Sequence, residues 1–461
     1  MNYKDTIAAI ASSSKNGSIS VIRVSGPQAL FGVSQIFRKK NGEIIDLTAK
    51  ESHTIHYGYI FDGKEEIIDQ VIVLVMKAPR SYTTEDVVEI QCHGGSLICQ
   101  LILEELLHHE IRIAEPGEFT KRAFLNGRID LSQAESVMDL IQADSQLALH
   151  NSLNQLRGNV REKIEELRQV ILTDIAFVEA ALDDPEHLSL DGYVDQIQNH
   201  GQELLEKINH LIHNFENGKI IKEGIQTAIV GKPNVGKSSF LNCILREDRA
   251  IVTDIAGTTR DTLEEEVRIG STLLRLIDTA GIRSTADQIE QIGIEKAKES
   301  IEKSDFVICI LDSSKDLEKE DLEVLEEASQ KPGVILLNKI DLDSRLEGQE
   351  IPFSQGKKIM SFSALEGHGL SELEDYLNQL FIQDKIDYND EIYITNMRQK
   401  EALYSARDSL LQLLETIQAG MPEDLFTIDM QNAYESLGLI IGQTIEDDIV
   451  DKIFKDFCMG K

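Results

Sequence analysis

The hydrophobic pattern divides the chain into four blocks. Up to about residue 120, short apolar runs such as Val71–Met76 and Val87–Gln91 alternate with single helical stretches such as Leu97–Leu107. This mixture predicts a compact α+β sheet domain. From about residue 121 to 223, apolar residues recur every three or four positions without a strand-like run, which predicts the helices of a bundle. We expect these helices over Ala123–Ala143, Leu153–Leu182 and Val194–Asn217.

From about residue 224 the pattern changes to short apolar runs separated by helical stretches. The runs are Gln226–Val230, Leu273–Ile277, Phe306–Leu311, Val334–Leu337 and Lys358–Phe362. This alternation predicts a doubly wound, mostly parallel sheet that ends near Phe381. Helical spacing then returns over Ala402–Ile417, Met430–Gly442 and Ile445–Phe454.

Helical blocks on both sides of an α/β domain indicate that this domain is inserted into one discontinuous bundle. The expected fold class is therefore multidomain α/β and α. The expected segments are an α+β domain at 1–120, a first helical part at 121–223, the inserted α/β domain at 224–383, and a second helical part at 384–461.

Composition narrows the class of protein. The 461 residues are 41% hydrophobic and 27% charged, as in soluble globular proteins, and no apolar run is long enough to span a bilayer. The N-terminus lacks a signal-peptide pattern and the five cysteines form no C-x-x-C pair, so we expect a cytoplasmic protein without a membrane segment. The net charge of −34 disfavours a broad nucleic-acid groove, so an RNA contact would need a local basic patch or a partner.

The run Gly231-Lys232-Pro233-Asn234-Val235-Gly236-Lys237-Ser238 follows an apolar strand and precedes a helical stretch. In that context G-x-x-x-x-G-K-[ST] is a P-loop, whose backbone N–H groups surround phosphate oxygens. We expect Lys237 to reach the outer phosphates and the Ser238 hydroxyl to bind Mg²⁺.

Further motifs follow in the order that a GTPase domain requires. Asp278-Thr279-Ala280-Gly281 matches D-x-x-G, and Thr259 lies in a candidate switch loop where it could bind Mg²⁺. Asn338-Lys339-Ile340-Asp341 places a carboxylate where it can accept two N–H groups of guanine, a pair of donors that adenine lacks. Ser363-Ala364 could donate a backbone N–H to the guanine O6.

The residue that follows D-x-x-G is Ile282, where Ras-like switches carry a glutamine that orients the attacking water. A replacement has to lie further along this loop, and the pattern leaves four candidates. They are Asp287, Gln288, Glu290 and Gln291. Arg260 and Arg283 are candidates for an arginine finger, and a role as solvated charges is equally compatible with their spacing.

With these motifs the chain resembles the MnmE (TrmE) family of tRNA-modifying GTPases from end to end. The resemblance is carried by Pro116-Gly117-Glu118-Phe119-Thr120-Lys121-Arg122-Ala123-Phe124-Leu125-Asn126-Gly127, by Asp130–Glu135, by the GTPase motifs, and by the terminal Cys458-Met459-Gly460-Lys461. It implies an N-terminal domain similar to folate-binding domains, which also forms a homodimer, and a TrmE-type G domain. It further implies a heterotetramer with the FAD- and NADH-dependent MnmG, which modifies C5 of the wobble uridine of certain tRNAs.

The resemblance also implies cofactors and site residues. A K⁺ ion would be bound by Asn234, Thr253, Ile255 and Thr258, and Mg²⁺ by Ser238 and Thr259. Arg23, Glu89, Arg128 and Lys461 would bind 5-formyl- or 5,10-methylene-tetrahydrofolate, the one-carbon donor. The expected catalytic residues are Lys237, Glu290 and Cys458, although Cys458 could equally be a redox bystander or a packing residue.

The full set of expected GTP-binding residues combines the motifs with this resemblance. It comprises Asn234, Val235, Gly236, Lys237, Ser238, Ser239, Thr253, Asp254, Ile255, Ala256, Gly257, Thr258, Thr259, Asp278, Thr279, Ala280, Gly281, Asn338, Lys339, Asp341, Ser363 and Ala364. Two alternatives to the tRNA-modifying enzyme stay open at this point. They are a regulatory GTPase switch of the ribosome-assembly type and a GTP-dependent dimerising scaffold.

Overall fold

The computed structural model describes most of the chain. The described residues are 5–12, 17–143, 145–246, 265–270, 272–277, 292–346, 348–383 and 394–443, together with 450, 453, 454, 457 and 460. The chain forms two compact units, one of Met1–Gln142, Ser152–Glu206 and Glu401–Lys461, and the other of Ala143–Asn151 and Lys207–Lys400. The first unit holds the N-terminal sheet together with helical segments, so the predicted boundaries at 120, 223 and 383 stay predictions.

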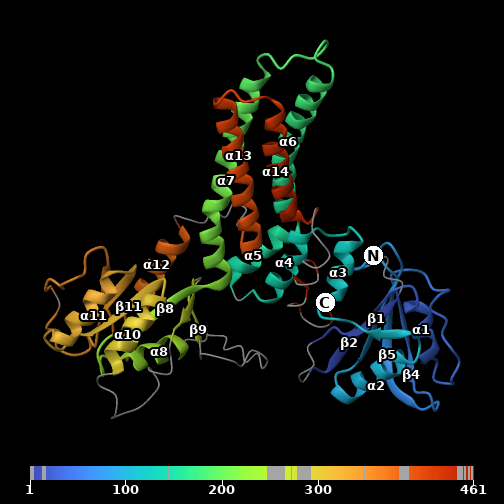
Figure 1. Ribbon diagram of the computed structural model, residues 1–461. Coiled ribbons are helices and arrows are strands. Elements are labelled where there is room, and N and C mark those ends of the chain that lie inside the picture. The colour runs from blue at the N-terminus through green and yellow to red at the C-terminus, as the bar shows by residue number, and fades with distance from the viewer. Residues whose placement is uncertain are drawn as a thin grey trace. The chain divides into compact units, whose positions relative to one another are not determined.

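The first unit contains a seven-stranded sheet in the order β3-β4-β5-β6-β2-β1-β7 (Figure 1). Its strands are β1 (Thr6–Ile10), β2 (Ile19–Ser25), β3 (Phe37–Arg38), β4 (Thr54–Phe61), β5 (Ile67–Met76), β6 (Val87–His93) and β7 (Ile111–Ile113). All neighbours are antiparallel except β1 and β7. Helices α1 (Ala29–Ile36) and α2 (Ser96–Leu107) contribute Val33 and Ile102 to the same buried cluster as Val73 of β5. The predicted α+β sheet is confirmed, and β3, β4 and β7 are strands that no predicted run covers.

The helical part of the first unit differs from the prediction in two places. The expected helix Ala123–Ala143 is two helices, α3 (Glu118–Leu125) and α4 (Leu131–Ile141), because Asp130 caps α4 and exchanges hydrogen bonds with Gln133. The expected helix Leu153–Leu182 is interrupted at Gly158, whose φ of 97° is left-handed.

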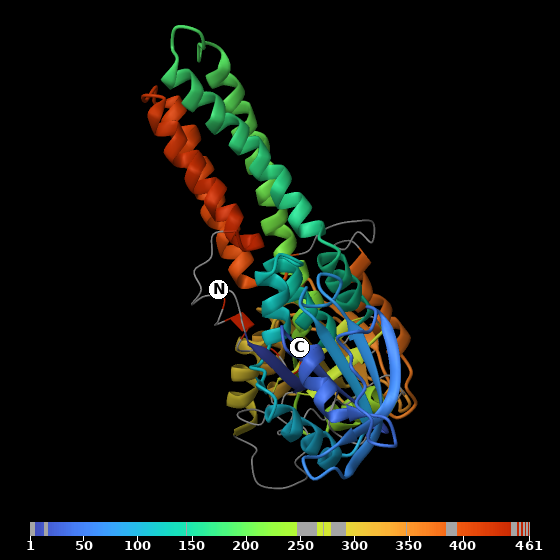
Figure 2. The same ribbon diagram turned by 90° about the vertical axis from the view of Figure 1, so that its right-hand side faces the viewer.

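Five further helices belong to the helical segments that the structure describes, and four of them pair as two hairpins (Figure 1). The five are α5 (Gln146–Leu156), α6 (Asn159–Asp183), α7 (Tyr193–Glu223), α13 (Met397–Gln418) and α14 (Asp424–Ile441). Figures 1 and 2 show the hairpin of α6 and α7 beside the hairpin of α13 and α14, so segments far apart in the sequence form one bundle. The predicted helix Ile445–Phe454 lies mostly outside the described residues.

The second unit contains a six-stranded sheet in the order β13-β12-β11-β8-β10-β9. Its strands are β8 (Ile225–Val230), β9 (Glu265–Ile269), β10 (Thr272–Leu276), β11 (Phe306–Asp312), β12 (Gly333–Asn338) and β13 (Lys358–Ser361). Every pair is parallel except β9 and β10. The predicted doubly wound, mostly parallel sheet is confirmed.

Helices pack on both faces of this sheet, as the fully apolar strands require. On one face, α8 (Lys237–Arg246) and α12 (Leu370–Asn378) contribute Phe240 and Leu373 to the core. On the other, α10 (Ile292–Lys303) and α11 (Lys319–Ser329) contribute Ile301 and Leu325. After β8 the chain forms β9 and β10 on one side of β8, and it then crosses to form β11 on the other side. The strand order therefore reverses at the end of β8, and sheets of this type bind ligands at such a topological switch point.

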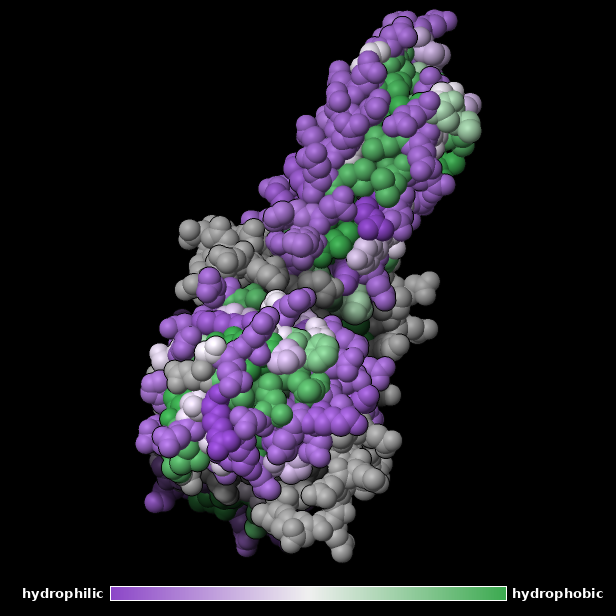
Figure 3. Space-filling model, turned by 90° about the vertical axis from the view of Figure 1, so that its left-hand side faces the viewer, coloured by the Kyte–Doolittle hydropathy of each residue, from purple (hydrophilic) through white to green (hydrophobic). Residues whose placement is uncertain are grey.

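Figure 3 shows mostly hydrophilic residues on the face drawn, with a stripe of apolar side chains along the bundle. Of the helices in the described ranges, none has the length and apolarity needed to span a membrane.

Candidate functional site

The loop after β8 is shaped by two glycines. Gly231 has a φ of 151° and a Cβ there would collide with the carbonyl oxygen of Ile310. Gly236 has a φ of 105° and a Cβ there would collide with the Nδ2 of Asn338. Both positions require glycine, and the loop leads directly into the N-terminus of α8. A loop of this kind ends with free backbone N–H groups that attract anions.

Lys237, the first residue of α8, lies inside this loop. Its ammonium group donates hydrogen bonds to the carbonyl oxygens of Gly231 at 2.6 Å and Lys232 at 2.9 Å. Burial lowers the pKa of Lys237 from its ordinary value. An ammonium group bound by neutral carbonyl groups can exchange them for anionic phosphate oxygens. Ser238 and Ser239 follow on the exposed first turn of α8.

The loop after β12 binds the P-loop at two consecutive carbonyl groups. The buried Asn338 donates from Nδ2 to the Val235 oxygen at 2.7 Å, and its Oδ1 accepts the N–H of Ala364 at 3.0 Å. Lys339 donates to the carbonyl oxygen of Asn234 at 2.8 Å and pairs with the buried Asp312 at 2.7 Å. The structure therefore joins the P-loop and both base-recognition motifs into one hydrogen-bonded assembly.

Asp341 is exposed at the edge of this assembly. Its Oδ1 accepts a hydrogen bond from the hydroxyl of the buried Ser363 at 2.7 Å. A carboxylate oriented in this way presents acceptors to a ligand with two neighbouring N–H donors, which is the pattern on the edge of guanine. The site can hold a phosphate chain at one end and a guanine base at the other.

The structure describes only part of the predicted nucleotide site. Asn234 to Ser239, Asn338, Lys339, Asp341, Ser363 and Ala364 are described and lie in one region of the second unit. The other predicted positions lie outside the described residues. They are Thr253, Asp254, Ile255, Ala256, Gly257, Thr258, Thr259, Asp278, Thr279, Ala280, Gly281 and Glu290.

A second candidate site in the first unit surrounds Tyr82. Arg23 is bound to Glu89 at 2.8 Å on neighbouring strands, and its guanidinium lies 5.3 Å from the centre of the Tyr82 ring. Arg128 lies 5.2 Å from the same ring and donates to the carbonyl oxygen of Ser81 at 2.7 Å. Two predicted folate-binding residues, Arg23 and Arg128, therefore converge on one aromatic ring, and a third, Glu89, contacts Arg23. Tyr82 was not predictable from the sequence, because a single tyrosine in a loop carries no pattern.

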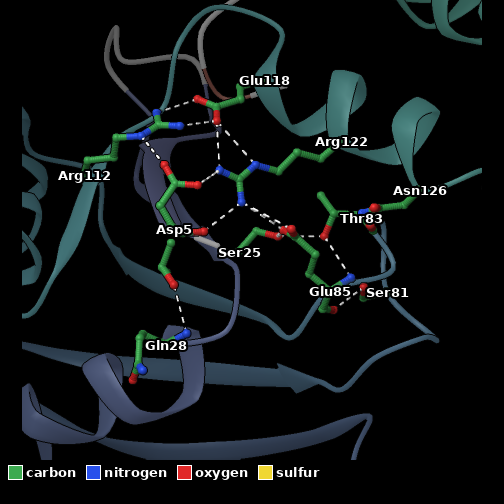
Figure 4. Close-up of polar contacts among 11 residues, drawn as sticks. Asp5, Ser25, Gln28, Ser81, Thr83, Glu85, Arg112, Glu118, Arg122 and Asn126 are labelled. Carbon is green, nitrogen blue, oxygen red and sulfur yellow. Dashed lines mark hydrogen bonds and ion pairs between the residues drawn. The ribbon is translucent and has the colours of Figure 1, made fainter. Parts of the chain in front are cut away.

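A buried ionic network holds the loop that carries Tyr82. Arg122 of α3 is fully buried and contacts Glu118 at 2.9 Å, Asp5 at 3.0 Å and Glu85 at 3.2 Å (Figure 4). Arg112 adds a second cation, at 2.5 Å from Glu118 and 2.6 Å from Asp5. Burial opposes ionisation of Glu118, but these arginines outweigh it and hold its pKa below the ordinary value.

The C-terminal segment lies against the same part of the first unit. Gly460 has a φ of 87°, and a Cβ there would collide with the carbonyl oxygen of Ile10 at the end of β1. Phe457 packs so closely on Gly117 that a Cβ at Gly117 would lie 2.6 Å from it. Cys458 and Lys461 lie outside the described residues; Ile10, which Gly460 approaches, is on β1, the strand that pairs with β2, where Arg23 lies.

The doubly wound sheet, the glycine loop at its switch point and the Asn338–Asp341 motif define a P-loop protein of the guanine-nucleotide-binding class. Family comparisons then narrow the class. The description "MnmE helical domain" matches residues 131–458, and "GTP-binding protein TrmE N-terminus" matches residues 6–128.

Similar proteins extend over the whole chain. A "tRNA modification GTPase MnmE" of Lachnoclostridium phytofermentans is 52% identical over 457 residues, which cover 99% of each chain. A protein of the same name from Clostridioides difficile is 45% identical over 462 residues, covering 100% of each. The chain belongs to the MnmE (TrmE) family of tRNA modification GTPases, as its resemblance suggested.

Among solved structures, the FeoB G-domain of Methanococcus jannaschii is 27% identical over 34% of this chain and 98% of its own, with a TM-score of 0.24.

Proposed function

We propose that this chain is a K⁺-activated GTPase that, with an FAD- and NADH-dependent MnmG partner, installs an aminomethyl or carboxymethylaminomethyl group at C5 of the wobble uridine of certain tRNAs. The observation that carries this proposal is the identity of 52% over the full chain with a relative named as a tRNA modification GTPase. The natural place for such a reaction is the cytoplasm.

For GTP hydrolysis, this chain supplies binding groups at both ends of the nucleotide. The N–H groups of the P-loop and the Lys237 ammonium would hold the phosphates, while Asp341 would accept the N–H groups of guanine. Ser238 lies on the first turn of α8, where its hydroxyl fits a Mg²⁺ ligand, and Thr259 is the proposed second ligand.

For K⁺, the proposed ligands are Asn234 and the carbonyl groups of Thr253, Ile255 and Thr258. Asn234 fits, because its side chain is exposed beside the P-loop and its amide oxygen is a hard donor suited to an alkali cation. A bound monovalent cation would offset negative charge that develops between the β- and γ-phosphates. Glu290 is the proposed residue that positions the attacking water.

For tetrahydrofolate, the proposed binding residues are Arg23, Glu89, Arg128 and Lys461, to which we add Tyr82. A flat aromatic ring flanked by two guanidinium groups and a carboxylate suits a ligand with a planar heterocycle and an acidic tail. Tetrahydrofolate would supply the one-carbon unit. The approach of the C-terminal segment to β1 supports a place for Lys461 and Cys458 near these residues.

The proposed homodimer is supported by an apolar patch on the outer face of the first sheet. Ile55, Tyr57 and Ile72 are 69%, 59% and 41% exposed, and Tyr57 pairs directly with Ile72 across β4 and β5. Adjacent exposed apolar residues of this size are typical of a protein interface.

Two measurements test the proposal. GTP hydrolysis should be much faster in K⁺ than in Na⁺, and Glu290→Ala should keep nucleotide binding while losing hydrolysis. Mass spectrometry of tRNA nucleosides from a deletion strain should show loss of the modified wobble uridine. Complementation with the wild-type gene should restore it, whereas Lys237→Ala should not. An unchanged wobble uridine would contradict the tRNA role and leave the GTPase proposal standing.

A further inference from the structure

The second residue of the P-loop has a contact that phosphate binding does not explain. Lys232 is 9% exposed, and its ammonium lies 2.7 Å from Asp321 and 3.1 Å from Glu318. Both carboxylates belong to the N-terminus of α11, more than 80 positions along the chain, at separations of 89 and 86 residues. The side chain of Lys232 therefore connects the phosphate-binding loop to a helix that contributes none of the predicted nucleotide-binding residues.

The acceptor end of this contact is a structured helix cap. Glu318 is the N-cap of α11, and its backbone N–H donates at 3.0 Å to Oδ2 of Asp321, the same oxygen that accepts from Lys232. Asp321 is 2% exposed, and its Oδ1 has no hydrogen-bond partner among the residues that the structure describes. A buried carboxylate with so few partners depends on a nearby cation.

The Lys232 ammonium and the two carboxylates of α11 carry opposite charges. Burial by itself would lower the pKa of Lys232, but the hydrogen bonds and charges of Asp321 and Glu318 outweigh it and raise that pKa. Lys232 is therefore a permanent cation held by two carboxylates. Its position in the loop is fixed by charge as well as by packing.

The backbone of Lys232 faces the catalytic side of the loop. Its carbonyl oxygen accepts a hydrogen bond from the Lys237 ammonium at 2.9 Å, next to the 2.6 Å bond to Gly231. One residue thus links the carboxylates of α11, through its side chain, to the phosphate-binding lysine, through its carbonyl group.

We propose that Lys232 is a positioning residue whose ion pairs with Asp321 and Glu318 hold the first peptide units of the P-loop in their phosphate-binding geometry. The proposal rests on GTP binding at this loop. A loop that is already ordered loses less entropy when the nucleotide binds, so the tether raises affinity without touching the reacting atoms. Freeing the backbone of one residue corresponds to about a 5- to 30-fold loss of affinity.

The test compares two variants with a matched control in the full-length protein. Lys232→Met keeps the apolar stem and removes the charge, and Asp321→Asn removes the charge at the other end. Lys319→Met is the control, because Lys319 lies on the same helix and pairs with Glu323 at 3.5 Å while 90% exposed. Dissociation constants for a fluorescent GDP and a non-hydrolysable GTP analogue, kcat, KM and the thermal midpoint without nucleotide are measured for each.

We expect Lys232→Met and Asp321→Asn each to raise Kd and KM about 5- to 30-fold, with kcat within about twofold of wild type. The double variant should be no weaker than the poorer single variant, because both remove the same contact. Lys232→Arg should recover most of the affinity, and Lys319→Met should bind like wild type.

Wild-type affinity in both single variants would overturn the proposal, and so would affinity losses that add in the double variant. A fall in thermal midpoint with unchanged Kd would show that the contact only stabilises the fold, which also overturns it. Failure of the wild-type protein to bind guanine nucleotides would instead refute the proposed function.

Discussion

Replacing Arg122 with methionine should destabilise the first unit locally and strongly. The guanidinium is fully buried, and it contacts Glu118, Asp5 and Glu85 at 2.9, 3.0 and 3.2 Å as well as the carbonyl oxygen of Asp5 at 3.0 Å. Methionine keeps much of the side-chain volume but leaves these acceptors without this cation. The substitution therefore isolates the electrostatic part of the contact from its packing.

The size of the stability loss depends on which cations still contact the three carboxylates in the variant. Removing one partner of a buried ion pair costs about 3–5 kcal/mol, because the other charge stays buried and uncompensated. Arg112 still contacts Glu118 at 2.5 Å and Asp5 at 2.6 Å, so two of the three carboxylates keep a cation. We therefore expect the lower end, about 3 kcal/mol. Lys163→Met is the control, because its pair with Glu166 is 37% and 66% exposed and should contribute less than about 1 kcal/mol.

Hydrogen exchange measured by mass spectrometry suits this question, because it reports the opening of individual segments. The chain has no tryptophan for a fluorescence signal, and a global melt of a chain with two compact units would mix their transitions. A loss of about 3 kcal/mol should speed exchange in β1 and α3 about a hundredfold. A change of less than about threefold in those segments would refute the view that the network carries local stability.

Three further predictions follow from the same reasoning. Asn338→Ala leaves the buried Val235 carbonyl without its donor, so guanine-nucleotide affinity measured by calorimetry should fall by about 1–3 kcal/mol, and undiminished affinity would contradict the role of this bond. The folded pKa of Glu118 is lowered, so its stabilisation should be complete above about pH 4.3 and be lost as the pH falls further. Glutamine cannot lose this stabilisation in acid, so the stability of Glu118→Gln, followed by circular dichroism, should depend less steeply on pH than that of wild type below about pH 4.3. The same pH dependence in both proteins would argue against this role of Glu118. Gly231→Ala forces a Cβ into the Ile310 carbonyl at a φ of 151°, so nucleotide binding should be abolished while the first unit keeps its exchange protection; normal binding would show that the loop tolerates a side chain.

The nucleotide motifs were predictable because each is contiguous in sequence. A phosphate chain is surrounded by successive backbone N–H groups, so its loop leaves a readable pattern in the sequence, with two glycines and a lysine at fixed spacing from Gly231 to Lys237. The Asn338–Asp341 motif is equally local. The sequence also indicated the doubly wound sheet, since its fully buried strands are continuous apolar runs.

The contacts that join these motifs were not predictable in the same way. Lys232 meets Asp321 across 89 positions, and neither residue type is unusual in its local sequence. The network around Arg122 takes acids from the residue before β1, from a loop and from α3, with a sequence separation of 117 residues from Asp5. A salt bridge of this kind has no period and no fixed spacing, so only the folded chain reveals it. The break between α3 and α4 is a different case, because the Asp130 and Gln133 capping pair was present in the sequence and was overlooked.

The segment of residues 116–127 now has a structural explanation. Within residues 116–127, Gly117 accepts the close approach of Phe457, Glu118 and Arg122 form the buried network, and Asn126 donates to the carbonyl oxygen of Thr83 at 2.7 Å. Each contact joins α3 either to the C-terminal segment or to the loop that carries Tyr82. Because these side chains make contacts within the fold, we infer that this segment supports Tyr82 indirectly, by holding the loop that carries it in place. The proposed folate ligand would instead meet the side chains around the ring, among them Arg23 and Arg128.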